Sequence, residues 1–138
     1  MNSRERVLSA IAHKETDKVP IDLGSNPSSG ISAISYDNLK KHLGMNHPTR
    51  VYDVVQQLAQ PHQEIIDHFG LDIIDIGREF NTNDNDWYNY KLSNGGTAQY
   101  PVWYKPQQSE DGSWFTTDEN GTMLSKMPVG ATFFDQTY

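Results

Sequence analysis

A short apolar segment of the chain leads directly into a loop of small polar side chains. Val19–Leu23 contains one charge, Asp22, and the loop that follows reads Gly-Ser-Asn-Pro-Ser-Ser-Gly. A carboxylate there accepts a hydrogen bond from a substrate or from a loop amide, and Gly24 lets the backbone approach a ligand closely. We predict that Asp22, Gly24, Ser25 and Asn26 bind a substrate. The alternative is that Asp22 only satisfies loop amides and the hydroxyls cap the next helix.

A second candidate follows another apolar segment, Leu71–Ile76. Asp75 lies near the C-terminal end of this predicted strand, and we expect it to bind substrate as well. Asp72 and Asp75 are three residues apart, so they point to opposite faces of a strand and do not form a general acid and base pair. Arg78 and Glu79 are expected to form a loop salt bridge. No residue is assigned a catalytic role.

The histidines give no sign of a metal site. His62 and His68 are six residues apart, which turns them away from a shared helix face, and no spacing such as H-E-x-x-H occurs. The chain has no cysteine, so thiolate zinc sites and disulfides are excluded. We therefore predict no metal ligands among these residues.

Composition limits the partners. The chain has 11 basic and 18 acidic residues and a formal charge of −7, which argues against nucleic acid and against an anionic membrane surface. Charges interrupt every apolar run of the N-terminal MNSRERVLSAIAHKE, which predicts an amphipathic helix rather than a signal peptide, and no stretch approaches a membrane span. We expect a cytoplasmic protein that binds small molecules or proteins.

The two parts of the chain differ in pattern, and we divide it into residues 1–80 and 81–138. The first part predicts two parallel strands connected by helices, the order of a βαβ unit. The predicted strands are Val19–Leu23 and Leu71–Ile76. Four helices are predicted: one that begins at Asn2 or Ser3, one over 31–43 that ends at Gly44, one over Val51–Leu58 with helical apolar spacing, and one from Pro61 to Gly70.

The second part is rich in aromatic residues. It holds 11 of the 15 aromatics, including all three tryptophans, and the turn sequences SNGG, SEDG and ENG separate them. This pattern predicts short antiparallel strands in a β-meander, after a linker over 81–86. The aromatics are expected to form the core of the meander; ligand stacking is the alternative.

Four segments together resemble the N-terminal part of the uroporphyrinogen decarboxylase family. They read NSRERVLSAIAHKETDKVPIDLG, SSGISAISYDNLKKHLG, RVYDVVQQLAQPHQEIIDHFGLDIIDIG and DENGTMLSKMPVGATFFD. The resemblance implies an α/β fold, the N-terminal portion of a (β/α)8 TIM barrel. Such barrels need about 250 residues, so we expect an incomplete barrel with an antiparallel β-meander excursion. The chain is then a fragment, or it pairs with a chain that completes the barrel.

The resemblance is greatest to the corrinoid-linked methyltransferase branch. True decarboxylases carry an arginine-containing stretch after the first strand that grips substrate carboxylates, whereas Gly24–Ser29 contains no arginine here. The branch transfers methyl groups between a corrinoid and a small-molecule donor or acceptor, often with zinc held by histidine and cysteines that this chain lacks. We expect an N-terminal fragment that is inactive alone, with a corrinoid protein as a partner. The alternatives are a non-catalytic binding module, or part of a uroporphyrinogen decarboxylase of porphyrin biosynthesis.

Overall fold

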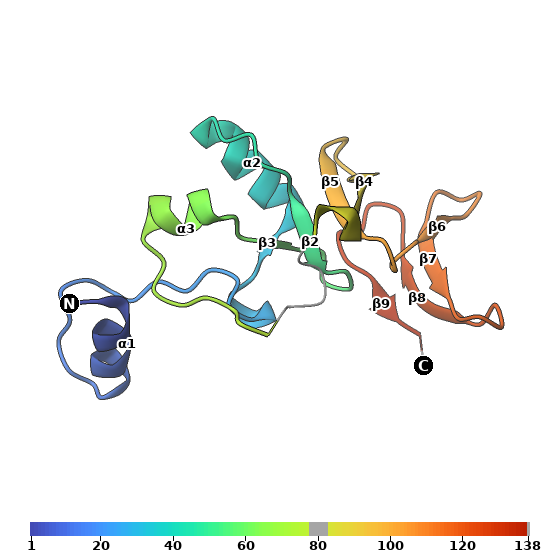
Figure 1. Ribbon diagram of the computed structural model, residues 1–138. Coiled ribbons are helices and arrows are strands. Elements are labelled where there is room, and N and C mark those ends of the chain that lie inside the picture. The colour runs from blue at the N-terminus through green and yellow to red at the C-terminus, as the bar shows by residue number, and fades with distance from the viewer. Residues whose placement is uncertain (78–82, 138) are drawn as a thin grey trace.

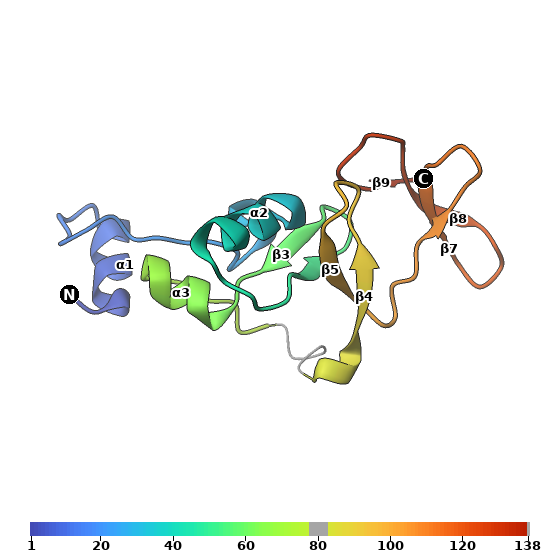
Figure 2. The same ribbon diagram turned by 90° about the horizontal axis from the view of Figure 1, so that it is seen from above.

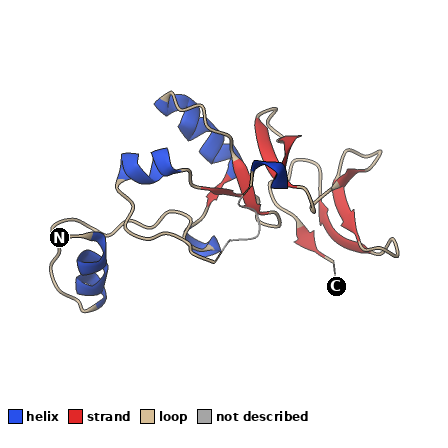
Figure 3. Cartoon of the chain, in the orientation of Figure 1, coloured by secondary structure: helices blue, strands red, loops and turns tan. Residues whose placement is uncertain are grey.

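The elements follow one another along an elongated molecule. The computed structural model describes residues 1–77 and 83–137, with the N-terminal helix at one end and a small C-terminal sheet at the other (Figure 1). Among the described residues, the three α-helices lie in the N-terminal half and most strands lie in the other half (Figure 3). Arg78, Glu79 and the first part of the predicted linker lie outside the described residues, and Asp84–Asp86 form a 3-10 helix, η3.

The three helices confirm most of the predicted helix boundaries. Helix α1, Ser3–Ile11, begins at Asn2, whose side chain accepts a hydrogen bond of 2.9 Å from the Glu5 amide. Helices α2, Ala33–Leu43, and α3, Gln63–Phe69, both end at a glycine in the left-handed region. Within the described residues, no helix has the length and apolar composition to cross a bilayer.

Two sheets contain the strands. The first sheet has the order β1-β3-β2-β5-β4, and the second follows the chain in the order β6-β7-β8-β9, which is a meander. The hairpin β4–β5 comes after residue 81 and yet joins the first sheet, through pairing of β5 with β2. The strands are β1 Ile31–Ser32, β2 Arg50–Asp53, β3 Leu58–Gln60, β4 Trp87–Lys91, β5 Thr97–Pro101, β6 Gln107–Gln108, β7 Trp114–Thr117, β8 Met123–Met127 and β9 Asp135–Gln136.

The prediction of a TIM barrel start is wrong. Both sheets are mostly antiparallel, and parallel pairing in the described part of the chain is limited to β2 with β5 and to one isolated bridge, Asp22 with Ile73. Between the two predicted strands there are this bridge, a backbone hydrogen bond of 2.8 Å from Asp72 to Ile21, and one of 3.0 Å from the Ile21 amide to the Asp72 side chain, and neither segment forms a regular strand. The helices and strands do not alternate as a barrel requires. Apolar runs such as these indicate burial, and burial alone does not fix the direction of pairing.

The predicted helix over Val51–Leu58 is also wrong. These residues form the end of β2, a turn and the start of β3. Asp53 directs the turn, because its Oδ1 accepts hydrogen bonds from the amides of Val55 and Gln56, at 3.1 and 2.8 Å. β-Branched valines favour strands, and the same apolar spacing is satisfied when a strand turns back on itself.

The main core lies between the two sheets and joins them. Tyr100 of β5 is fully buried at its centre, and Phe134 packs against the same cluster while its amide donates to the Val55 carbonyl, 2.8 Å away. Gln57 lies at this junction with a left-handed backbone, φ 58°. Its side chain accepts a hydrogen bond from the Tyr100 hydroxyl and donates to the Val54 carbonyl, and its own carbonyl accepts from the Ala33 amide that begins α2.

Candidate functional site

A cleft of about 430 Å³ lies between the loop after Leu23, the N-terminal end of α3 and the segment that follows α3. The two loop segments run together below α3 in Figure 1, and Figure 2 shows the same part of the molecule from above. This volume is within the range of about 300–1,000 Å³ that is usual for small-molecule sites. The lining residues are Leu23, Gly24, Ser25, Gln60, Pro61, Gln63, Ile66, Leu71, Ile73, Ile74, Asp75 and Ile76.

The cleft brings together three of the five predicted substrate-binding residues. Gly24, Ser25 and Asp75 line it, although Asp75 is 50 residues away in the sequence. Asp22 and Asn26 do not line the cleft. Asp22 accepts hydrogen bonds from the amide and hydroxyl of Ser25, at 3.1 and 2.7 Å, so it holds the loop in shape. Asn26 accepts from the Ser28 amide at 2.9 Å and caps the 3-10 helix η1, Pro27–Ser29.

The charge of the cleft is acidic. Asp75 is the one charged side chain among the lining residues that the structure describes, and its Oδ1 accepts a hydrogen bond of 2.6 Å from the Gly77 amide. Ile74 and Ile76 lie at the mouth and are 61% and 85% exposed. The walls are otherwise mostly apolar, so the cleft suits a small molecule that is uncharged or carries a positive charge.

We expect Gly24→Ala to deform this cleft. Gly24 has φ 80°, and a Cβ there would lie 2.8 Å from Cγ and 2.9 Å from Cδ of Pro61, which also lines the cleft. The left-handed backbone and the clash together should lower the free energy of unfolding by about 1–3 kcal/mol in urea denaturation. Gly121→Ala is the matched control, because Gly121 has φ 83° and no atom within 4 Å of the added Cβ. Equal losses in the two variants would contradict the role given to Pro61.

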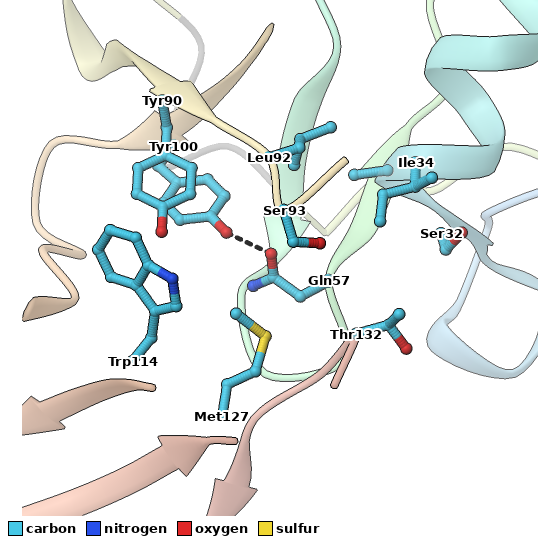
Figure 4. A pocket seen from close by; sticks show the side chains of 11 residues that line it. Ser32, Ile34, Gln57, Tyr90, Leu92, Ser93, Tyr100, Trp114, Met127 and Thr132 are labelled. Atoms are coloured by element: carbon cyan, nitrogen blue, oxygen red, sulfur yellow. Dashed lines mark hydrogen bonds between the residues drawn. The ribbon is translucent and has the colours of Figure 1, made fainter. Parts of the chain in front are cut away.

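A second cavity lies between the two sheets and is part of the core. It is lined by Tyr90, Tyr100, Trp114 and Met127 among others, and its volume is about 20 Å³, room for about one water molecule (Figure 4). The rings of Tyr90 and Tyr100 stack at 4.1 Å, and Trp114 meets Tyr90 edge to face at 5.4 Å. These aromatics pack against each other, which agrees with the expected core role and leaves no room there for a stacked ligand.

One cluster of potential metal ligands was not predicted from the sequence. His47, in the loop after α2, contacts His62 and Glu64 at the start of α3, and one possible metal-ligand atom from each lies within 4.8 Å of the others. His47 and His62 are 15 residues apart, so no short motif marks them. Comparison of the chain with family models, with curated proteins and with solved structures finds no match.

Proposed function

We propose that this chain binds a small methyl compound in the cleft, as the substrate-holding part of a corrinoid-dependent methyltransferase resembling the uroporphyrinogen decarboxylase family. One observation carries the proposal. The cleft is built from Leu23–Ser25 and Leu71–Ile76, two segments on which the resemblance depends, and they come together although they are distant in sequence.

The charge of the cleft favours a methyl donor over a porphyrinogen. A substrate with many carboxylates needs arginine or lysine partners. Among the described residues that line the cleft there is no cation, and Asp75 would repel an anion. An uncharged methoxy compound or a methylated ammonium ion fits apolar walls with a single carboxylate.

The cofactors that the resemblance implies, a corrinoid and a zinc ion with thiolate ligands, do not fit the residues of the cleft. A zinc site with thiolate ligands needs cysteine, and the chain has none. A corrinoid ring is much larger than a cleft of about 430 Å³. In this proposal the cofactors come with a partner protein, the chain alone transfers no methyl group, and the complex works in the cytoplasm, which suits a chain without disulfides.

A second candidate is a non-catalytic binding module. It is favoured by the strong exposure of Ile74 and Ile76, because apolar side chains at the mouth of a cleft suit a ligand or a partner that covers them. The two candidates share the cleft and differ in what happens after binding.

Calorimetry with four probes tests the proposal. Trimethylammonium and guaiacol should bind to the full chain, vanillate should bind more weakly because its carboxylate approaches Asp75, and uroporphyrin should not bind. Asp75→Asn should remove the preference for trimethylammonium over vanillate. Asp135→Asn removes an exposed carboxylate of β9 in the second sheet; it is the matched control and should leave the binding of all four probes unchanged.

Tight binding of uroporphyrin, or no binding of either methyl compound, would overturn the proposal. Added methylcobalamin and a thiol acceptor separate the two candidates further. Methyl transfer by the chain alone would contradict the proposal that catalysis requires a cofactor-carrying partner protein. Turnover that appears only with a cofactor-carrying partner favours the enzyme part, and binding that no partner converts to turnover favours the module.

A further inference from the structure

A group of three potential metal ligands lies where the loop after α2 meets the start of α3. The Nδ1 atom of His47 is 3.0 Å from Oε2 of Glu64, and the rings of His47 and His62 stack at 4.2 Å. His47 is 9% exposed, whereas His62 and Glu64 are exposed. None of the three lines the cleft, so this group is separate from the proposed substrate site.

The hydrogen bonds around His47 fix its protonation. A carboxylate only accepts, so the contact with Glu64 places the ring proton on Nδ1. Nε2 is then an acceptor, and it receives the hydroxyl proton of Tyr36, 2.9 Å away, while the Tyr36 oxygen accepts from the His62 amide at 2.9 Å. Burial, the largest effect, favours this neutral ring and lowers the pKa of His47 despite the opposing effect of Glu64. Burial raises the pKa of Tyr36 to about 12, so its hydroxyl stays protonated.

We propose that His47, His62 and Glu64 bind a zinc ion through two imidazoles and a carboxylate, with the fourth position open to solvent. Two imidazoles and one carboxylate form one of the usual three-ligand zinc sets, and zinc–nitrogen bonds of 2.0–2.1 Å place tetrahedral ligand atoms about 3.3 Å apart. The pair from His47 and Glu64 already has nearly this spacing.

Binding requires a small rearrangement. Nδ1 of His62 accepts from the Glu64 amide at 3.3 Å and so caps α3, which leaves Nε2 as the ligand atom. The two rings are nearly parallel, 13° apart, so the exposed ring of His62 must turn to direct Nε2 at a shared ion. On His47 the ion takes Nδ1, and the ring proton moves to Nε2 and donates to the Tyr36 oxygen, which orients the ring. The Tyr36 hydroxyl proton then gives up Nε2 as its acceptor, a cost that the zinc–nitrogen bond has to exceed.

One nearby charge opposes the ion. Lys40 is buried and donates to the His47 carbonyl. Burial lowers its pKa, and Asp37 lies 3.8 Å from its ammonium, which offsets part of the repulsion. The negative charge of Glu64, itself one of the three ligands, offsets the rest of the repulsion between Lys40 and the ion.

Titration of the full chain with zinc chloride by calorimetry tests the site. We expect one ion per chain, and at least about tenfold weaker binding in each of two variants that keep the local structure. His62→Asn keeps a preferred N-cap acceptor and removes the imidazole. Glu64→Gln keeps an oxygen that accepts from His47 and removes the charge. His68→Ala, an exposed histidine on the same helix, is the control and should bind zinc as the unchanged chain does.

Cobalt(II) gives a second readout, because tetrahedral coordination produces visible absorption that the two variants should lack. Thermal melting without metal checks that the variants fold. The proposal is overturned if the unchanged chain shows no saturable binding, if either variant binds like the unchanged chain, or if His68→Ala weakens binding equally.

Discussion

Replacing Tyr100 with alanine lowers the free energy of unfolding by about 3–5 kcal/mol, the usual cost of removing a buried aromatic ring. Tyr100 is 0% exposed and contacts three other tyrosines: it stacks on Tyr90 and meets Tyr88 and Tyr104 edge to face. Because the cluster connects the two sheets, the loss should appear as a single transition at lower denaturant in both fluorescence and circular dichroism.

Two further variants separate the contributions of Tyr100. Tyr100→Phe keeps the ring and leaves the side chain of Gln57 without its donor, so we expect a smaller loss of about 1–3 kcal/mol. Trp103→Ala is the control, because Trp103 is an aromatic of the same region that is 58% exposed. If Trp103→Ala lowered the free energy of unfolding as much as Tyr100→Ala does, the core would not depend on Tyr100 in particular.

Replacing Arg6 with alanine releases α1 from the rest of the molecule. The guanidinium of Arg6 is buried and pairs with Asp17, at 2.7 Å, and with Asp72, whose side chain is fully buried. Leu8 and Ile11 of the same helix are mostly exposed, so α1 has little apolar packing to hold it. Hydrogen exchange should show that the amides of α1 lose protection while β2 and β5 keep theirs.

Arg4→Ala is the matched control, because Arg4 lies on the same helix and is exposed. It should leave the exchange of α1 unchanged. Protection of α1 that persists in Arg6→Ala would show that backbone contacts, not this ion pair, anchor the helix.

Acid should release the same helix in the unchanged chain. Hydrogen bonds from Arg6 and the N-terminal ammonium hold the pKa of Asp17 well below its ordinary value. Burial would raise the pKa of Asp72, but hydrogen bonds from the Ile21 amide, Ser3 and Arg6 lower it overall. Both carboxylates have a lower pKa in the folded state than in the unfolded state, where the pKa of aspartate is about 4. Their contribution to the stability of the fold is therefore complete above about pH 4 and is lost as the pH falls through the folded-state pKa values. The protection of the α1 amides, measured relative to the intrinsic exchange rate at each pH, should fall over that acidic range.

Local signals in the sequence predicted local structure well. Asn2 before α1, Gly44 after α2 and Gly70 after α3 each fix a helix end through their own backbone and side-chain preferences. Such signals act within a few residues, so they hold whatever the rest of the chain does.

Pairing direction could not be predicted in the same way. The spacing of Val51, Val54, Val55 and Leu58 fits a helix, and the two hydrogen bonds to Asp53 turn the chain back instead. The hairpin β4–β5 pairs with β2 across about 50 residues, a contact that no periodicity in either segment indicates. The prediction of a barrel was wrong because the sequence does not show which strand pairs with which.

The candidate sites show the same limit. Gly24 and Asp75 were predicted as substrate-binding residues at the ends of two strands, and the structure places both in one cleft although those strands do not form. His47 was set aside because no motif joined it to another ligand, and only the packing of the loop after α2 against α3 brings it to Glu64. Residues that share a short segment are visible in a sequence, and residues that meet through folding are not.

The junction at Gln57 restricts the paths by which this sequence can evolve. Glycine and asparagine accept its left-handed backbone, but glycine has no side chain and asparagine is one methylene short of reaching Tyr100 and Val54 together. Glutamate has the length and cannot donate. A change at position 57 leaves the Tyr100 hydroxyl or the Val54 carbonyl without its partner, and loss of the Tyr100 hydroxyl leaves the Gln57 oxygen without a donor, so positions 57 and 100 constrain each other.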